Sequence, residues 1–342
     1  MCDSIARAAV ALLIAVLLCT GCDGSRQWEE LDGPEGGPAE LVGATSAGEV
    51  YALCGDGLYA SSDAGGRWRR LPSPPATVRK VAVSDRCLVA AVDDGVSHSS
   101  PKRILYRTKA GSWSDYTGDL DVGYVASLAA VDCDIYLVAR ADEMGVWRRR
   151  VGEASWTRLA SGLEGAVPRL VRGVGDRVVV VAFGQRDVCA SIHRLDSVSE
   201  RWTPAEAGVQ LRDMRTGLHG PSLTVSGGEL LYSSTTGVAY RMSQGGRSWA
   251  VIPSTTHRRA EGMSQHALSL RGAPIVRHGD ATYTTARVHD PGAGMRPYAG
   301  VCRWDSRART WQLSAGWPTG VWASSLLSTR EALLAGGSSH SA

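Results

Sequence analysis

Hydrophobic residues in this chain occur in short runs separated by Gly, Asp and Ser. Runs such as AELVGATS, EVYALCGD, VASLAAV, DIYLVAR and RVVVVAFG are rich in Val, Leu, Ile, Ala and Tyr. Short runs of these residues between turn formers are typical of β-strands. No 3.6-residue periodicity stands out beyond the N-terminal segment, so the pattern predicts strands and no helices.

Tryptophan recurs along the chain at nearly regular intervals. Trp28, Trp68, Trp113, Trp156, Trp202, Trp249 and Trp311 are separated by 40, 45, 43, 46, 47 and 62 residues. Each of the last six ends a similar stretch, for example GLYASSDAGGRW and SIHRLDSVSERW. With two further strand-like runs ahead of it, each unit contains about four strands, and a unit this small cannot bury its own core.

This repeat predicts an all-β fold, a β-propeller of four-stranded antiparallel blades over residues 27–342. Tandem sandwich domains would need roughly 100 residues each. Trp28 has no strands ahead of it, whereas VWASSLLS and EALLAGG have no Trp after them. We therefore expect RQWEEL to be the outermost strand of the last blade, with SSHSA as a weak third strand. This closure gives a seven-bladed propeller with six continuous blades, and a six-bladed ring is the alternative.

The N-terminal segment MCDSIARAAVALLIAVLLCTGCDGS contains one basic residue, Arg7, before an apolar run from about Ala8 to Cys19. This run is short for a membrane span and is typical of an export signal. The sequence LCTGC at 18–22 resembles the bacterial lipoprotein signal, although Cys19 stands where Leu is usual. The resemblance implies a signal peptide at residues 1–21, outside the fold, a lipidated Cys22 and a tether at 22–26. An ordinary cleaved signal or an uncleaved anchor is the alternative.

Composition is consistent with an exported globular protein. The 342 residues are 44% hydrophobic and 21% charged, and the formal net charge is +3, which gives no indication of a nucleic-acid partner. The signal predicts a location in the bacterial cell envelope, tethered to the membrane and facing the periplasm or the exterior; the membrane leaflet stays open.

Five cysteines follow Cys22, namely Cys54, Cys87, Cys133, Cys189 and Cys302. In an oxidising compartment some of them can pair, and an odd number leaves at least one unpaired within the chain. Cys87 and Cys133 precede the second strands of adjacent units, so they are either a bridge between blades or two buried thiols. No spacing suggests a metal site, and we expect no cofactor.

The stretch Ser61-x-Asp63-x-Gly65-x-x-Trp68 resembles the Asp-box, or bacterial neuraminidase repeat, which in that family joins the third and fourth strands of a blade. We expect Asp63 to accept backbone amides, Gly65 to adopt a positive φ and Trp68 to pack on the hairpin. These roles are structural. The chain is similar to non-catalytic relatives such as exported bacterial propellers and the photosystem II assembly factor.

The resemblance leaves two classes of function. A sialidase-like or other glycoside hydrolase would need an arginine cluster, a Tyr–Glu pair and a general acid, and the Arg-Ile-Pro sequence usual in sialidases is missing. The sequence therefore favours a non-catalytic binding or scaffold protein for a protein or glycan partner, and the hydrolase is the alternative. The identity of the partner and the oligomeric state stay open.

Two long loops between second and third strands are candidate ligand loops, at residues 93–103 and 278–300. The second carries His278, Asp280, Tyr283, Arg287, His289, Asp290 and Arg296. Its histidines and aspartates could collect a cation, or the loop is simply a polar surface. Trp304, Trp317 and Trp322 are candidate stacking residues for a glycan, with core packing as the other explanation.

Overall fold

The computed structural model describes most of the chain. The described residues are 13–17, 28–34, 39–55, 57–74, 76–93, 102–184, 190–207, 209, 222–226, 228–233, 239–243, 246, 248–252, 267–269, 274–289, 298–305, 307, 310–314 and 321–339. All regular elements in these ranges are strands, which confirms the all-β prediction. A search of the same ranges finds no helix with the length and apolarity needed to span a membrane.

Six blades are antiparallel sheets of consecutive strands, and the first three have four strands each. Blade 1 contains β3 (Glu40–Ala44), β4 (Val50–Cys54), β5 (Gly57–Ser61) and β6 (Arg69–Arg70). Blade 2 contains β7 (Thr77–Val83), β8 (Cys87–Asp93), β9 (Arg103–Thr108) and β10 (Ser114–Asp115). Blade 3 contains β11 (Tyr124–Val131), β12 (Asp134–Arg140), β13 (Met144–Arg149) and β14 (Thr157–Arg158).

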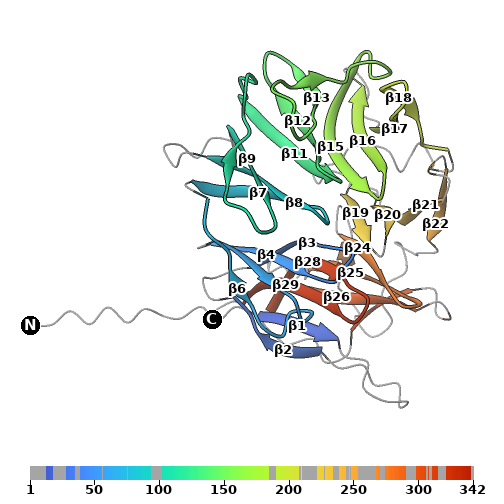
Figure 1. The fold of residues 1–342 in the computed structure, drawn as a ribbon. Helices are drawn as coiled ribbons and strands as arrows, with labels where there is room; N and C mark the ends of the chain where they lie inside the picture. Colours follow the sequence, from blue (N-terminus) through green and yellow to red (C-terminus); the bar gives the residue numbers. More distant parts are fainter. Residues whose placement is uncertain are drawn as a thin grey trace, which may run out of the picture.

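The next three blades continue in chain order. Blade 4 contains β15 (Ala166–Val174), β16 (Arg177–Gly184), β17 (Ala190–Asp196) and β18 (Arg201–Pro204). Blade 5 contains β19 (Ser222–Ser226), β20 (Glu229–Ser233), β21 (Ala239–Met242) and β22 (Trp249–Ile252). Blade 6 has five strands, β23 (Ala267–Ser269), β24 (Ile275–His278), β25 (Ala281–His289), β26 (Tyr298–Asp305) and β27 (Thr310–Leu313). Their colours follow one another around the molecule (Figure 1).

A further sheet combines the two ends of the chain, and we call it the end sheet. Its strand order is β2 (Trp28–Asp32), β1 (Leu13–Leu17), β29 (Leu333–Ser339) and β28 (Val321–Ser328). The segment RQWEEL thus supplies the outer strand of a sheet that contains two C-terminal strands, and β1 lies between it and them. The third strand is β1, whereas Ser338 and Ser339 of SSHSA end β29 and residues 340–342 lie outside the described residues. Residues 13–17, which we expect to belong to a signal peptide at residues 1–21, pair with both β2 and β29 in the uncleaved chain.

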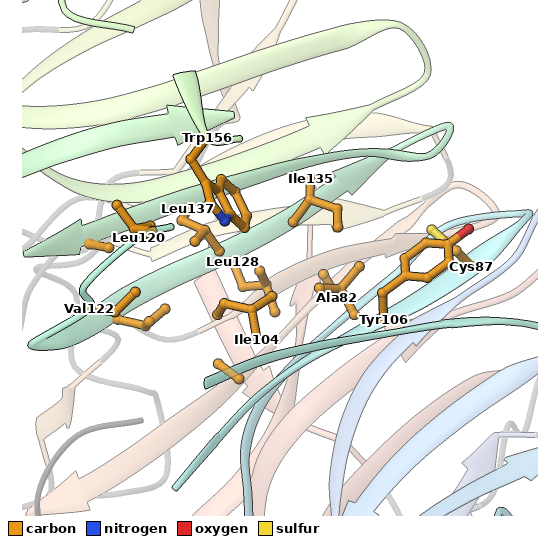
Figure 2. Close-up of a cluster of buried hydrophobic side chains, with 14 residues drawn as sticks. Ala82, Cys87, Ile104, Tyr106, Leu120, Val122, Leu128, Ile135, Leu137 and Trp156 are labelled. Atoms are coloured by element: carbon orange, nitrogen blue, oxygen red, sulfur yellow. The ribbon is translucent and has the colours of Figure 1, made fainter. Parts of the chain in front are cut away.

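The hydrophobic core lies between the sheets. The cluster shown in Figure 2 draws Val89 and Ile104 from blade 2 and Leu128 and Leu137 from blade 3. Similar clusters join blades 1 and 2, 3 and 4, 4 and 5, and 5 and 6, and the end sheet shares clusters with blades 6 and 1. Every residue of β8 is buried, because neighbouring sheets cover both of its faces. This explains why second strands are continuous apolar runs.

Four of the recurring tryptophans connect blades 2, 3, 4 and 5 each to the blade before it. The indole Nε1 of Trp113 donates to Pro72 O at 2.8 Å, and that of Trp156 donates to Thr117 O at 2.8 Å. Trp202 donates in the same way to Leu159 O at 3.0 Å, and Trp249 to Ala205 O at 2.6 Å. Each accepting carbonyl lies just beyond the outer strand of the preceding blade. These four tryptophans therefore recur once per blade because each blade makes one such contact.

Serines connect the first strands near the other edge of the blades. Val171 N donates to Ser127 Oγ at 3.1 Å, and Ser127 Oγ donates to Val171 O at 3.2 Å. Ser226 makes the same pair of bonds to Arg277, at 2.9 and 3.1 Å. Leu41 N donates to Ser325 Oγ of the end sheet at 2.9 Å. These bonds satisfy backbone groups of strands at the sheet edge, which have no ladder partner on that side.

Replacing Trp202 by Phe tests the tryptophan contact. The variant keeps an aromatic ring but removes the Nε1 donor and leaves Leu159 O buried without its partner. We expect a loss of about 1–2 kcal/mol in the free energy of unfolding, measured by urea denaturation.

Trp68→Phe is the matched control, since Trp68 Nε1 is buried with no hydrogen-bond partner among the described residues. An equal loss of stability in both variants would show that the indole–carbonyl bond contributes nothing beyond ring size.

Candidate functional site

A pocket of about 330 Å³ lies beside blade 3. Its lining consists of Asp119, Leu120, Asp121, Gly123, Ala141, Asp142, Trp147 and Trp156. Residues 119–123 belong to the connection that leads from blade 2 into β11, and residues 141–142 to the β12–β13 loop. We call this site the blade 3 pocket. Its size is at the lower end of the range for small-ligand sites, roughly 300–1,000 Å³.

Trp156 forms a fixed wall of the pocket. Its side chain is buried and belongs to the cluster between blades 2 and 3, at the end where Leu120 and Val122 lie (Figure 2). Besides the indole bond to Thr117 O, its main-chain N–H donates to Asp119 Oδ1 at 3.2 Å. The two bonds hold the connection from blade 2 against blade 3, so the pocket is formed before any ligand binds.

Trp147, on β13, forms the second aromatic wall. Its side chain is partly exposed, and Nε1 is buried without a hydrogen-bond partner among the described residues. A buried indole N–H usually has an acceptor. The Arg158 guanidinium lies 6.0 Å from the ring centroid and pairs with Glu143 at 3.1 Å. Trp147 therefore contributes an aromatic surface to the pocket, and its Nε1–H is a donor without a partner among the described residues.

Three carboxylates surround the two indoles. Asp119, Asp121 and Asp142 are exposed, and the lining includes no Lys, Arg or His. The pocket is therefore locally negative in a protein whose formal net charge is +3. Carboxylates accept hydrogen bonds from hydroxyl and ammonium groups. No group of three or more His, Cys, Asp or Glu in the described ranges has the arrangement of a metal site.

The segment predicted as one ligand loop, residues 278–300, is mostly strand. Residues 281–289 form β25, and residues 298–305 form β26. The sequence TYTTARVH alternates in a way that fits a strand, and β25 pairs with β23, β24 and β26. The larger spacing between Trp249 and Trp311 thus reflects a five-stranded blade, and the prediction of a single loop is wrong.

The structure separates the candidate residues of that segment. His278 and Asp280 lie at the turn into β25, whereas His289 lies at its far end, about 26 Å away for an extended strand. His278 is buried, with Nδ1 3.3 Å from Ser328 Oγ. Asp280 is exposed. Tyr283 is a core residue, 0% exposed.

The remaining candidates are only partly described. Arg287 and His289 belong to β25, but their side chains are outside the description. Asp290, Arg296 and the proposed lipidation site Cys22 lie outside the described residues. The same holds for residues 94–101 of the other candidate loop and for Trp317. Trp322 is in β28 without a described side chain, and Trp304 packs edge-on against Trp311 at 5.5 Å.

The turn that carries Ser61, Asp63 and Gly65 joins β5 to β6, the third and fourth strands of blade 1. Arg67 N donates to Asp63 Oδ1 at 2.8 Å, and Gly65 N donates to Ser61 Oγ at 2.8 Å. The φ of Gly65 is 97°, and Trp68 packs on the core of blade 1. These hydrogen bonds account for Ser61 and Asp63 as turn residues.

A sialidase-like hydrolase would need a Tyr–Glu pair, and the described residues contain a hydrogen-bonded pair of this kind. Tyr51 OH donates to Glu49 Oε2 at 2.5 Å. Tyr51 is 2% exposed and belongs to the core between blades 1 and 2. Burial, followed by the hydrogen bond to Glu49, raises the pKa of Tyr51 above its usual value. A hydroxyl enclosed in this way is a packing element and not a nucleophile open to substrate.

Comparisons with known proteins support the fold. No protein-family model matches the chain, and no curated protein matches it. Among solved structures, one similar chain is the extracellular domain of a protein described as a hybrid two-component system from B. thetaiotaomicron. It has a TM-score of 0.55 and 11% identity, and the match covers 90% of this chain and 38% of that chain.

A second structure is an extracellular domain described as belonging to a one-component system from B. thetaiotaomicron. Its TM-score is 0.52 at 11% identity, and the match covers 89% of this chain and 38% of that chain. This chain thus spans less than half the length of the structures it matches. The class that the fold defines is an all-β propeller of four-stranded antiparallel blades. The comparisons do not extend to the Asp-box family or the photosystem II assembly factor.

Asp63→Ala tests the Asp-box turn and its pH dependence. The backbone N–H of Arg67 and then the Ser61 hydroxyl lower the pKa of Asp63 below its usual value. A lowered folded-state pKa stabilises the protein above the unfolded-state value, about 3.9, and this contribution is lost as pH falls through the folded-state pKa. We expect a loss of about 1 kcal/mol at pH 7, measured by urea denaturation, that shrinks between pH 5 and pH 3.

Asp176→Asn, at a side chain 96% exposed, serves as the control. A difference between Asp63→Ala and the parent protein that stays constant over this pH range would contradict the role of the ionised carboxylate.

Proposed function

We propose that this protein is an exported, membrane-tethered propeller without catalytic activity that binds a glycan in the blade 3 pocket. The observation that carries the proposal is the combination of two indoles and three exposed carboxylates around one cavity of about 330 Å³. The solved structures with a similar fold are extracellular domains, which is in keeping with a binding domain outside the cytoplasm.

The chemistry of a sugar ring matches this lining. A pyranose has an apolar C–H face and a rim of hydroxyl groups. Trp147 supplies a partly exposed aromatic surface for the face, and aromatic rings in such sites combine large contact area with a polar edge. Asp121 and Asp142 supply acceptors for the hydroxyl donors. A pocket closed by one strong apolar wall and a few polar groups is typical of small-ligand sites.

A protein partner would be expected to use a larger surface, roughly 800 Å² from each side. Among the large hydrophobic side chains that are described, Tyr124, Val151, Val198 and Val251 are the exposed ones. Because these four come from blades 3, 4 and 5, they do not indicate one apolar docking face. The glycan therefore fits the described residues better than a protein does.

The double variant Asp121→Asn and Asp142→Asn tests the pocket. It removes two charges and keeps side-chain size, and both positions are exposed, so folding should be unaffected. The parent protein is screened on an array of bacterial and plant glycans, and hits are measured by calorimetry. We expect the variant to bind a hit about 10- to 100-fold more weakly, a loss of about 1.4–2.8 kcal/mol in total, because each Asn keeps a neutral acceptor and only the charged part of each hydrogen bond is lost.

Asp176→Asn again serves as the control for removal of an exposed carboxylate, and we expect it to bind like the parent protein. An array without hits would exclude the glycan. Hits that the double variant retains in full would place binding elsewhere on the protein.

The membrane tether is the second part of the proposal, with Cys22 as the lipidated residue after cleavage of residues 1–21. Cleavage at this point removes β1, so the four-stranded end sheet belongs to the uncleaved chain. Lipid attachment at Cys22 would place the end sheet close to the membrane, because only five residues, 23–27, separate Cys22 from Trp28 at the start of β2.

Cys22→Ser in the full chain tests the tether, with Cys19→Ser as the matched control. We expect the parent protein and Cys19→Ser to incorporate labelled fatty acid in a Gram-negative host and to sediment with membranes, and Cys22→Ser to do neither. N-terminal peptide mapping then shows whether residues 13–17 remain. Their presence in the exported protein would contradict cleavage before Cys22.

The number of blades belongs to the same proposal. We interpret the end sheet as a seventh blade that closes the ring, with β2 as its outer strand. Support comes from the two hydrophobic clusters that it shares, one with blade 6 and one with blade 1. Main-chain contact adds to this, since Ala39 N donates to Gly337 O at 3.2 Å. Closure of this kind covers edges that would otherwise be open to other chains.

A further inference from the structure

Two of the described cysteines meet between blades 2 and 3. Cys87 begins β8 and is 0% exposed, and Cys133 lies in the turn between β11 and β12 with partial exposure. The other two described cysteines, Cys54 and Cys302, belong to separate clusters of buried residues. Cys87 and Cys133 are therefore the one pair of described cysteines that the fold brings to a common interface.

Ser84 links the two turns that carry these thiols. Ser84 Oγ donates to Asp132 O at 2.6 Å, and Cys87 N donates to Ser84 Oγ at 3.1 Å. Ser84 Oγ is also 3.2 Å from Cys87 Sγ. The turn before β8 is thus bonded to the residue directly before Cys133.

The sulfur atoms have common neighbours. Cys87 Sγ lies 3.6 Å from Asp132 O, and Tyr106 OH donates to Cys133 Sγ at 3.9 Å. Figure 2 shows the Tyr106 hydroxyl at the same end of the cluster as the Cys87 sulfur. Besides burial, the Cys133 thiol is close enough to contribute to the raised pKa of Cys87. A disulfide requires the two sulfurs to come within about 2.05 Å of each other, and these shared contacts hold both thiols at the same place in the interface.

We propose that Cys87 and Cys133 form a disulfide that staples blade 2 to blade 3 when the protein meets an oxidising dithiol–disulfide carrier. The proposal does not depend on the glycan site. It concerns the same interface, because the cluster that ends at Cys87 also contains Leu120 and Trp156 of the blade 3 pocket.

The reaction is a thiol–disulfide exchange in two steps. The Cys133 thiolate attacks one sulfur of the carrier disulfide, forms a mixed disulfide and releases the other carrier sulfur as a thiolate. The Cys87 thiol then loses its proton and attacks the Cys133 sulfur, and the second carrier thiolate leaves. Two protein thiols are oxidised, and one carrier disulfide is reduced to two thiols.

The difference in burial determines which of the two thiols reacts with the carrier first. Cys133 is the more accessible of the two, so it meets the carrier first. Desolvation raises the pKa of Cys87 to about 12, which keeps its reactive thiolate scarce in the folded protein. We therefore expect the bond to form faster during folding, while Cys87 is still solvated, than by oxidation of the finished propeller.

The experiment uses the full chain refolded with a mixture of reduced and oxidised glutathione. The protein is then denatured in an alkylating reagent and digested, and cross-linked peptides are identified by mass spectrometry. We expect a peptide pair joined through Cys87 and Cys133. The melting temperature, followed by circular dichroism, should fall by about 5 °C or more on reduction, since the bond closes a loop of 46 residues.

Cys133→Ser should lose both the cross-link and the sensitivity of the melting temperature to reductant. Cys302→Ser, which changes a thiol of another cluster, should keep both. Complete alkylation of Cys87 and Cys133 in the refolded parent protein would overturn the proposal, as would a cross-link that joins either of them to Cys189.

Discussion

The structure depends on contact between neighbouring sheets, because a blade of four short strands is too thin to bury either face alone. The contact has two parts in the described blades. Apolar residues of second strands such as β8 and β16 are covered on both sides, and the indole of Trp156, Trp202 or Trp249 is anchored on a carbonyl of the preceding blade. The hydrogen bond fixes the angle at which the apolar surfaces meet, which an apolar contact alone does not specify.

The same anchoring forms the candidate site. The bond from Trp156 to Thr117 O draws the connection between blades 2 and 3 across the edge of blade 3. Asp119 and Asp121 thereby line the same pocket as Asp142 of the β12–β13 loop. At the other end of the same core cluster lie Cys87 and the turn that carries Cys133. One interface between blades therefore carries both the proposed ligand site and the proposed disulfide, and the stability of that interface bears on both.

Much of the fold could be predicted from the sequence, because the tryptophan spacing and the apolar runs recur with each contact between neighbouring blades. Other features depend on pairing between distant segments, which spacing does not encode. Residues 281–289 have the composition of a polar loop, but in the structure they form a strand that pairs with β23 and β26. Residues 13–17 have the composition of an export signal, but in the uncleaved chain they pair with β29. The sequence indicates the blade 3 pocket only weakly, through the acidic residues of DLD at 119–121 and DE at 142–143. The pocket forms because Trp147 and Trp156 pack beside these residues, and the sequence does not show that packing.

Exchange of the indole N–H protons with solvent tests the central claim most directly. The protein is labelled with 15N and transferred to D2O, and the indole signals are assigned with single Trp→Phe variants. If each blade is anchored on the one before it, the Nε1 protons of Trp156, Trp202 and Trp249 persist long after exposed amide protons have exchanged. Exchange of these three protons at the rate of exposed groups would contradict the account, because it would mean that the contacts between blades open freely.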